Sequence, residues 1–272
     1  MAEQERLARA ADTAPPWRPP GHGLIGGCFV AYARGEQGPG QAGDRAWAAA
    51  VTWRSSPGGT RRPGRIPVHP GSRRAADVED QAVVPGATGD RYRPGLLALR
   101  EGPLLEAAVR ALAVPPDVLL VDATGRDHPR RAGLALHLGA VLGLPTVGVT
   151  HRPLVAVGPP PELRRGATSP VVAGGQVVGY WVCTRSKARP VVAHAGWRTS
   201  AEVAAEVVLG CSGEGPAPRP RSGRPAGRRA RPGPWPRAGP LPEPDSGLVV
   251  AVDVGLPGLE ADPLVQPVGR LA

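Results

Sequence analysis

The pattern of apolar and polar residues at the start of the chain predicts a helix followed by a β-hairpin. Residues 1–13 are expected to form a short helix, which the proline-rich connector 14–20 ends. Residues 25–34 and 46–54 are two apolar runs on either side of a glycine-rich turn, a pattern typical of paired strands. The stretch that follows is ambiguous, and one short strand is expected there, near residues 65–69.

A strand, a helix and a second strand are predicted in the middle of the chain. Residues 118–121 are wholly apolar, as in a strand buried on both faces of a sheet. A helix over 131–142 and a second apolar strand at 146–149 follow, so the order indicates a βαβ unit with parallel strands. Before this unit, residues 96–113 repeat apolar positions at helical spacing and end at two prolines.

The remaining elements complete an α/β domain. Residues 176–184 and 190–194 are predicted to form a late hairpin, and residues 200–209 a final helix. A hairpin that joins a mixed sheet with flanking helices makes an α/β fold of roughly 200 residues. We therefore predict three regions: an N-terminal helix and connector (1–20), a folded domain (21–211) and a tail (212–272).

Composition separates this tail from the domain. The chain has 38 glycines, 35 prolines and a formal charge of +10. Residues 212–240 hold seven arginines against one glutamate, threaded with proline and glycine, so they are expected to be disordered, with an isolated strand near 248–254. Arginine carries nearly all the positive charge, which suits phosphate contacts. A charge bias set by genome composition, and a tail without a task, are equally open explanations.

Cysteine usage and hydropathy bear on the compartment. Cys28, Cys183 and Cys211 have neither close pairing nor metal-ligand spacing, which indicates free thiols in a reducing compartment. The N-terminal residues lack the apolar segment of a secretory signal, and no run of about eighteen apolar residues occurs. We therefore predict a cytoplasmic protein without a membrane span.

Two carboxylates are candidate ligands for a hard cation. Asp122 directly follows the apolar run 118–121, and open α/β sheets bind ligands beyond the carboxyl ends of parallel strands. Glu101 lies near the start of the predicted helix 96–113, among residues expected to be buried. Taken singly, each is explained as well by an ordinary loop, cap or exposed acid. If they meet across a strand–helix contact, they form a magnesium or manganese site.

The sequence around these acids resembles the endonuclease V family. The segment RYRPGLLALRE, and then PDVLLVDATGRDHPRRAGLALHLGAVLGLPTVGVT, follow the motifs of these deoxyinosine-directed nucleases, which have an RNase H-like fold. The match is dense over residues 92–149 and weaker from 25 to about 209. It implies a magnesium-dependent endonuclease, also served by manganese, that acts as a monomer on inosine-containing DNA or RNA. Such an enzyme cleaves a phosphodiester 3′ to the lesion in nucleic-acid repair.

The resemblance also implies roles for individual residues. Glu101 and Asp122 are the implied metal ligands, and His128 is the implied third catalytic residue, at the scissile phosphate. Part of the nucleic-acid contact falls in the wedge loop (residues 91–95), which enters the strand beside the damaged base. The implied nucleic-acid-binding residues are Tyr92, Pro94, Gly95, Arg130, Arg131, His151 and Arg152. For Tyr92, a surface aromatic in a turn is the alternative.

Two departures from the family pattern affect the expected metal site. Phe29 stands where family members carry a metal-binding aspartate, and Trp197 stands where they carry a histidine. A phenyl ring cannot ligate a cation, so one hydrated metal ion is expected rather than two. Compensation by Asp44, Asp127 or His194 is left open by the sequence.

Three functions therefore remain open. The first is the metal-dependent inosine endonuclease. The second is a catalytically impaired homologue that binds inosine-bearing or structured nucleic acid without cleavage, with Phe29 and Trp197 as rings that stack on bases. The third is a basic protein with a vestigial site, whose charge reflects genome composition.

Overall fold

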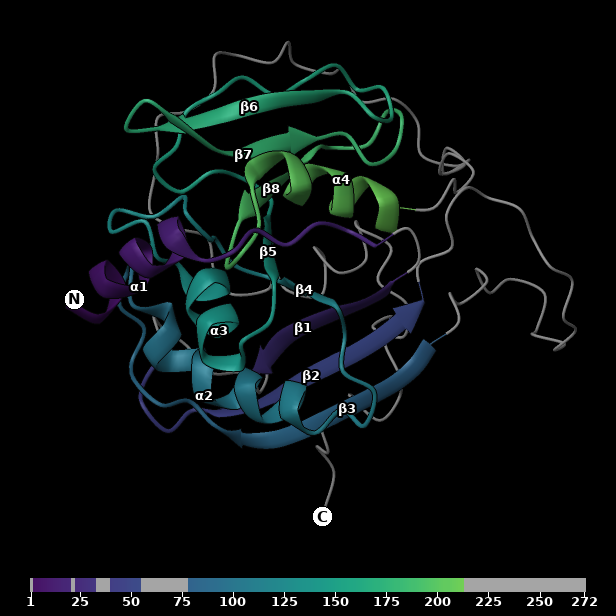
Figure 1. Ribbon diagram of the computed structural model, residues 1–272. Helices are drawn as coiled ribbons and strands as arrows, with labels where there is room; N and C mark the ends of the chain where they lie inside the picture. Colours follow the sequence, from purple (N-terminus) through teal and green to yellow (C-terminus); the bar gives the residue numbers. More distant parts are fainter. Residues whose placement is uncertain (1, 21–22, 33–39, 55–77, 213–272) are drawn as a thin grey trace, which may run out of the picture.

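A mixed sheet with helices on both faces forms the framework of the protein in the computed structural model (Figure 1), which describes residues 2–20, 23–32, 40–54 and 78–212. The strands are β1 Leu24–Tyr32, β2 Arg45–Arg54, β3 Val78–Ala87, β4 Val118–Val121, β5 Thr146–Thr150, β6 Thr168–Ala173, β7 Gln176–Val182 and β8 Val191–Ala195. Their order across the eight-stranded sheet is β3-β2-β1-β4-β5-β8-β7-β6. The α/β fold predicted from the sequence is confirmed.

The centre of the sheet contains the predicted βαβ unit. β4 lies between β1 and β5 and is parallel to both, with Cys28 opposite Val121 and Val121 opposite Gly148. All four residues of β4 are buried, as expected of an apolar strand covered on both faces. The carboxyl ends of β1, β4 and β5 therefore lie at one edge of the sheet, where Asp122 begins the next loop.

Antiparallel strands flank this centre on both sides. β1 and β2 form the predicted N-terminal hairpin, and β7 and β8 form the predicted late hairpin. β3 and β6 were not predicted. Both are outermost strands with largely exposed side chains and an internal proline, so their apolar alternation is weak. The strand expected near residues 65–69 lies outside the described residues.

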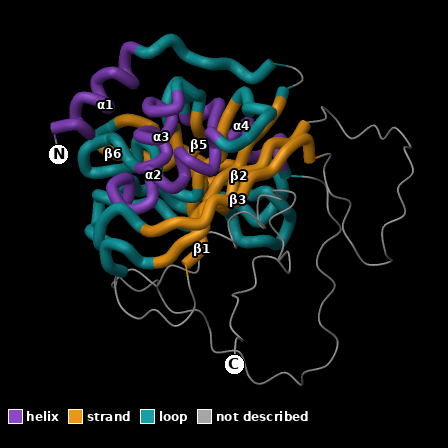
Figure 2. The backbone as a smooth tube through the Cα atoms, turned by 90° about the horizontal axis from the view of Figure 1, so that it is seen from below, coloured by secondary structure: helices purple, strands orange, loops and turns teal. Residues whose placement is uncertain are grey.

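Four helices are described: α1 Ala2–Thr13, α2 Leu97–Arg110, α3 Leu134–Leu142 and α4 Ala201–Cys211. α2 and α3 pack on one face of the sheet, and α4 packs on the other. α1 lies against α3, and the connector after it runs to the side of the molecule that carries α4 (Figures 1 and 2). The N-terminal helix is therefore part of the packed body over the described residues.

The helix expected from residue 131 begins later, at Leu134. Arg131 has a φ of 55°, a left-handed conformation that ends the preceding loop and cannot start a helix. The predicted tail falls almost wholly among residues 213–272, which lie outside the described residues, as does the strand near 248–254. None of the described helices has the length and apolar character needed to cross a membrane.

Candidate functional site

Glu101 and Asp122 lie within each other's electrostatic influence at the carboxyl edge of β4. Asp122 directly follows β4, and Glu101 is in the first half of α2. Burial raises the pKa of Glu101 to about 7. Burial, and after it the negative charge of Glu101, raise the pKa of Asp122 to about 7. Two acids that resist ionisation side by side form a site that a divalent cation would stabilise.

Tyr32, at the end of β1, fixes the orientation of Glu101. Its hydroxyl donates a hydrogen bond of 2.5 Å to Oε1 of Glu101. Burial, and then the charge of Glu101, raise the pKa of this phenol, so it stays a donor. The guanidinium carbon of Arg100 lies 4.9 Å from the centre of the Tyr32 ring, a cation–π contact that holds the ring. Glu101 is thus a preorganised carboxylate.

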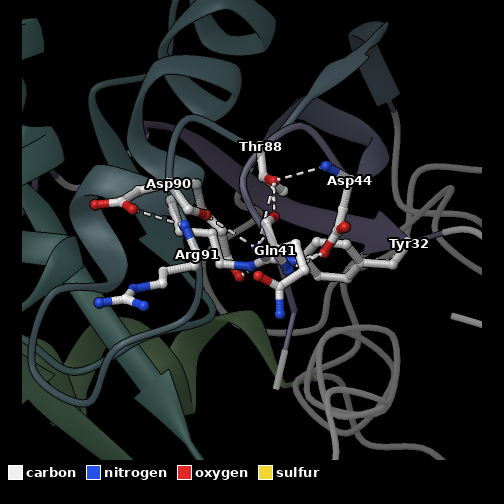
Figure 3. Close-up of polar contacts among 8 residues, drawn as sticks. Tyr32, Gln41, Asp44, Thr88, Asp90 and Arg91 are labelled. Carbon is white, nitrogen blue, oxygen red and sulfur yellow. Dashed lines mark hydrogen bonds and ion pairs between the residues drawn. The ribbon is translucent and has the colours of Figure 1, made fainter. Parts of the chain in front are cut away.

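Arg100 also ties three loops together beneath this site (Figure 3). Its Nη1 donates to the carbonyl oxygens of Gln41 (2.7 Å) and Asp90 (3.0 Å), and its Nη2 donates to Oδ2 of Asp44 (2.8 Å). Figure 3 shows Gln41, Asp44, Thr88 and Asp90 gathered in this cluster. Because Asp44 is bonded to Arg100, which lowers its pKa, it acts as an ion-pair partner within the loop cluster.

Phe29 lies beside the start of the loop that carries Asp122. Cys28 is opposite Val121, so the next pair along the two parallel strands is Phe29 and Asp122. The ring is buried, with 6% of its surface exposed. Among the described ranges, no three or more histidine, cysteine, aspartate or glutamate side chains are grouped closely enough to hold a metal ion. Oxygen donors from Glu101 and Asp122 nevertheless suit one hydrated magnesium or manganese ion.

Cys28 faces the same side of β1 as Tyr32, since side chains alternate along a strand. Its thiol pKa is raised by burial first, and then by the charges of Asp122 and Glu101. The thiol is therefore protonated near neutral pH. Cys28 and Cys183 are buried, Cys211 is half-buried, and all three are free, as predicted.

His128 and Arg130 both contact the wedge loop. His128 is buried, and its Nε2 lies 3.1 Å from the carbonyl oxygen of Gly95. Nη2 of Arg130 donates to the same oxygen at 2.8 Å. The backbone N–H of Arg130 approaches Nδ1 of His128 (3.2 Å), which identifies Nε2 as the protonated nitrogen that donates to Gly95. Their predicted contact with a phosphate stays a prediction.

The other predicted nucleic-acid-binding residues are spread over three segments. Tyr92 is half-buried, with its backbone N–H bonded to the carbonyl of Gly40 at 3.0 Å, and Pro94 is exposed. Arg131 lies 3.4 Å from Asp12 of α1. His151 is half-buried and Arg152 is exposed, just beyond the end of β5. The structure therefore places Tyr92, Pro94 and Gly95 next to His128 and Arg130, and leaves His151 and Arg152 on a neighbouring strand end.

Asp127 and His194 form a buried pair that links separate segments. Oδ2 of Asp127 accepts from the backbone N–H of Leu154 (2.6 Å), and its Oδ1 accepts from Val155 (2.9 Å) and Ala156 (2.7 Å). Nδ1 of His194 lies 3.6 Å from Oδ2 of Asp127, and Nε2 lies 2.7 Å from Oγ1 of Thr150. Burial lowers the pKa of His194 to about 4. These contacts occupy both side chains that the sequence offered as substitute ligands.

Trp197 belongs to a small apolar cluster between α1 and α3. Its ring packs against a group that includes Leu7, Ala132 and Leu136. Its backbone N–H donates to Oγ1 of Thr146 at 2.9 Å. The preceding segment is packed tightly against the loop of Asp122, because a Cβ on Gly125 would lie 2.0 Å from the carbonyl oxygen of Ala195. Trp197 thus contributes apolar packing where the family has an imidazole.

Three residues of this site were missed by sequence reasoning: Tyr32, Arg100 and Gln4. Tyr32 and Arg100 lie inside segments that resemble the family motifs, so they could have been noted as conspicuous polar residues next to predicted ligands. Gln4 has no such signal, because it reaches the site from a helix 91 positions away from Gly95 in the chain.

Comparisons with known proteins agree with this geometry. The family model described as Endonuclease V matches residues 72–223. Endonuclease V of Methanopyrus kandleri is 46% identical over 144 residues, which is 53% of this chain and 62% of that protein. The matched part thus spans under two thirds of that relative.

Solved structures agree with the fold. Endonuclease V from Streptomyces avermitilis is 33% identical, with a TM-score of 0.64 over 78% of this chain and 82% of that chain. A variant of Endonuclease V from Ciona intestinalis, crystallised with DNA containing an inosine followed by a ribo-adenosine, is 22% identical, with a TM-score of 0.55 over 77% of this chain and 86% of that chain. The expected RNase H-like fold is confirmed. The chain belongs to the endonuclease V family.

Proposed function

We propose that this protein is a metal-dependent endonuclease that cleaves inosine-containing DNA or RNA 3′ to the lesion. The observation that carries the proposal is the pair Glu101 and Asp122, two carboxyls with pKa values of about 7 at the carboxyl edge of parallel strands. Membership of the endonuclease V family supports it. So does the inosine-containing DNA bound by the Ciona intestinalis protein of the same fold.

In this proposal the two acids and their supports carry the chemistry. Glu101 and Asp122 would hold Mg²⁺ or Mn²⁺, which supplies an activated water and offsets the charge that develops on the phosphate. Tyr32 keeps Glu101 oriented through the 2.5 Å hydrogen bond to its Oε1. Because that bond uses one lone pair of Oε1, the second carboxylate oxygen is left as the stronger donor to the cation.

The wedge loop would recognise the lesion. A base stacked inside a strand hides its reading edge, so it has to leave the stack before inosine can be distinguished. Tyr92 is half-buried and close in the chain to the exposed Pro94, a placement suited to filling the space that the base leaves. His128 and Arg130 lie at the base of this loop, in the segment that begins at Asp122.

A second function is favoured by one specific observation, the buried Phe29 beside Asp122. Without a carboxylate at this position the cation has two protein ligands, and cleavage can be lost while binding persists. The protein would then bind inosine-bearing strands without cutting them.

A cleavage assay separates these functions. Full-length protein is incubated with Mg²⁺ or Mn²⁺ and end-labelled strands that differ in a single inosine or adenine, as DNA and as RNA. We expect cleavage of the inosine strands only, with a rate lower by about 100-fold or more for Asp122→Asn and Glu101→Gln, because each removes a ligand of the activating cation. Intact inosine strands under all conditions would reject the nuclease.

Phe29→Asp tests the binding alternative in the same assay. Restoring a carboxylate beside Asp122 should raise the cleavage rate about tenfold or more and lower the Mg²⁺ concentration that half-saturates it, because a third oxygen ligand is added. Phe29→Leu is the matched control, since it removes the ring without adding a ligand. If Phe29→Asp is folded and no faster than the wild type, Phe29 does not limit cleavage.

A further inference from the structure

Three side chains converge on one backbone carbonyl in the wedge loop. The carbonyl oxygen of Gly95 accepts hydrogen bonds from Nε2 of Gln4 (3.0 Å), Nε2 of His128 (3.1 Å) and Nη2 of Arg130 (2.8 Å). A carbonyl oxygen has two lone pairs, so three donors at these distances saturate it. His128 and Arg130 belong to the motif loop (residues 122–133), whereas Gln4 comes from α1.

Gln4 is the residue that joins these parts. Its side chain is buried, with 7% of its surface exposed. Besides Gly95, its Nε2 donates to the carbonyl of Ala132 at 3.0 Å, and its Oε1 accepts from Nε of Arg130 at 2.6 Å. One amide therefore bonds to the wedge loop, to the end of the motif loop and to the guanidinium that itself holds Gly95. A buried amide with its donors and acceptor engaged has one preferred position.

The helix that carries Gln4 is anchored independently. Leu7, Ala8 and Ala11 of α1 pack against Ala132 and Leu136. Asp12, at the other end of the helix, forms ion pairs with Arg126 and Arg131 of the motif loop. α1 is thus attached to the motif loop at both ends, and Gln4 reaches Gly95 from a fixed platform.

Gly95 leaves little freedom at the contact. Its φ is 74°, in the left-handed region, and a Cβ there would lie 3.1 Å from Nη2 of Arg130 and 3.3 Å from Nε2 of His128. The absence of a side chain allows the donors to approach the carbonyl closely. The same residue marks the end of the wedge loop, three positions after Tyr92.

We propose that Gln4 is a positioning residue that sets the wedge loop against the motif loop. It thereby fixes the place of Tyr92 relative to Asp122, and so couples entry of the wedge into the strand to the position of the scissile phosphate. The proposal rests on the proposed function for the role of the wedge, while the contact itself is independent of any activity. Its partner is a strand with an unstacked base, recognised by Tyr92.

Hydrogen–deuterium exchange of the full chain tests the positioning directly. We expect backbone amides of residues 90–99 to exchange about threefold faster or more in Gln4→Met than in the wild type, because the loop loses one of the three donors to Gly95. Glu5→Met is the matched control, an exposed neighbour on the same helix, and should leave the rate unchanged. Equal rates in Gln4→Met, Glu5→Met and the wild type would overturn the proposal.

Gln4→Glu keeps the size of the side chain and separates its two functions. The carboxylate still accepts from Nε of Arg130, but it cannot donate to Gly95 or Ala132. We expect residues 90–99 to exchange faster than in the wild type here too, with the thermal midpoint held closer to the wild-type value by the retained Arg130 contact. Wild-type exchange in Gln4→Glu would show that the bond to Gly95 does not position the loop.

A fluorescence experiment connects the position to the wedge. A DNA strand with 2-aminopurine next to inosine brightens when the neighbouring base leaves the stack. In Ca²⁺, used to suppress cleavage, we expect wild type and Glu5→Met to raise the emission and Gln4→Met to give less than half that rise at saturation. An equal rise in Gln4→Met would reject the coupling to the wedge. If wild type itself gives no rise while exchange changes as expected, the proposed function fails and the positioning contact stands.

Discussion

Glu101 and Asp122 differ from ordinary surface acids in the environment that surrounds them. Each has a pKa raised to about 7, for Glu101 by burial and for Asp122 by burial and then by the charge of Glu101. In the unfolded chain both acids ionise near their ordinary pKa values of 4.5 and 3.8. The folded state without metal therefore binds more protons than the unfolded state between about pH 4 and pH 7.

This difference gives a pH-dependent stability with a defined sign. A raised pKa in the folded state contributes stability that is present below the unfolded pKa and is lost as pH rises through the folded value. We expect the free energy of unfolding of the metal-free protein to fall between about pH 4 and pH 8 for this reason. Asp122→Asn should reduce that fall by about 1–2 kcal/mol, given ~1.4 kcal/mol per pKa unit and partial solvent access. Urea titrations in a chelator measure it.

The control for this prediction is His194, whose effect has the opposite sign. Burial lowers its pKa to about 4, so it stays neutral in the folded state while the unfolded chain takes up a proton below about pH 6.5. Stability is thus lost as pH falls from 6.5 to about 4. His194→Gln should flatten that acid side and leave the alkaline side unchanged, and Asp122→Asn should do the reverse. Identical profiles for Asp122→Asn and wild type would show that this carboxyl ionises normally.

At this scale the sequence was informative about residues inside dense motifs. Asp122 and Glu101 were identified because one follows an apolar strand and the other lies in a recognisable segment. The contact with Tyr32 depends on how β1 is placed under α2, and that of Gln4 depends on the docking of α1. Such contacts come from tertiary packing, which has no local pattern in the chain.

The motif loop, between β4 and α3, is the element on which the site depends most. It carries Asp122, and it is held from three sides: by α1, by the wedge loop, and by the segment after β5 that bonds to Asp127. Asp127 accepts three backbone N–H groups from residues 154–156. This anchor therefore connects the loop of the proposed metal ligand to the strand end that carries His151 and Arg152.

Asp127→Asn should weaken this anchor. An amide offers one acceptor oxygen, so its NH₂ group must face a backbone N–H that the carboxylate now satisfies. We expect a loss of about 2–3 kcal/mol in unfolding free energy, because a buried donor is left without an acceptor. Urea unfolding and faster amide exchange in residues 152–158 would measure it.

Asp117→Asn is the matched control for the anchor. Asp117 is exposed and accepts one backbone N–H, from Leu24 at 2.8 Å, so its loss should cost under about 1 kcal/mol. Equal costs for the two variants would mean that the contacts of Asp127 add nothing beyond a surface hydrogen bond.

Elements with strong apolar patterns were predicted well, and the outermost strands were not. The bounds of β4 agree with the prediction because a strand covered on both faces is apolar throughout. β3 and β6 alternate weakly because they are covered on one side only, and each contains a proline. The start of α3 was misplaced because Arg131 adopts a left-handed conformation that its residue type does not announce.

At the scale of the whole molecule, the sheet brings sequence-distant groups to one edge. The parallel centre places the ends of β1, β4 and β5 together, so Tyr32, Asp122 and Thr150 lie along it. α2 adds Glu101 from one face, and α1 braces the loops from outside. The fold class followed from the order of elements, whereas the bracing by α1 followed only from the structure.

The central claim is that Glu101 and Asp122 hold a divalent cation. Calorimetric titration of the full-length, metal-free protein with Mn²⁺ at about pH 8, above both pKa values, tests it without substrate. The account predicts a single binding event that is lost in Glu101→Gln and in Asp122→Asn and retained in Glu106→Gln, an acid on the same helix that pairs with Arg110. Unchanged Mn²⁺ binding in the folded Glu101→Gln and Asp122→Asn proteins, or none in the wild type, would contradict it.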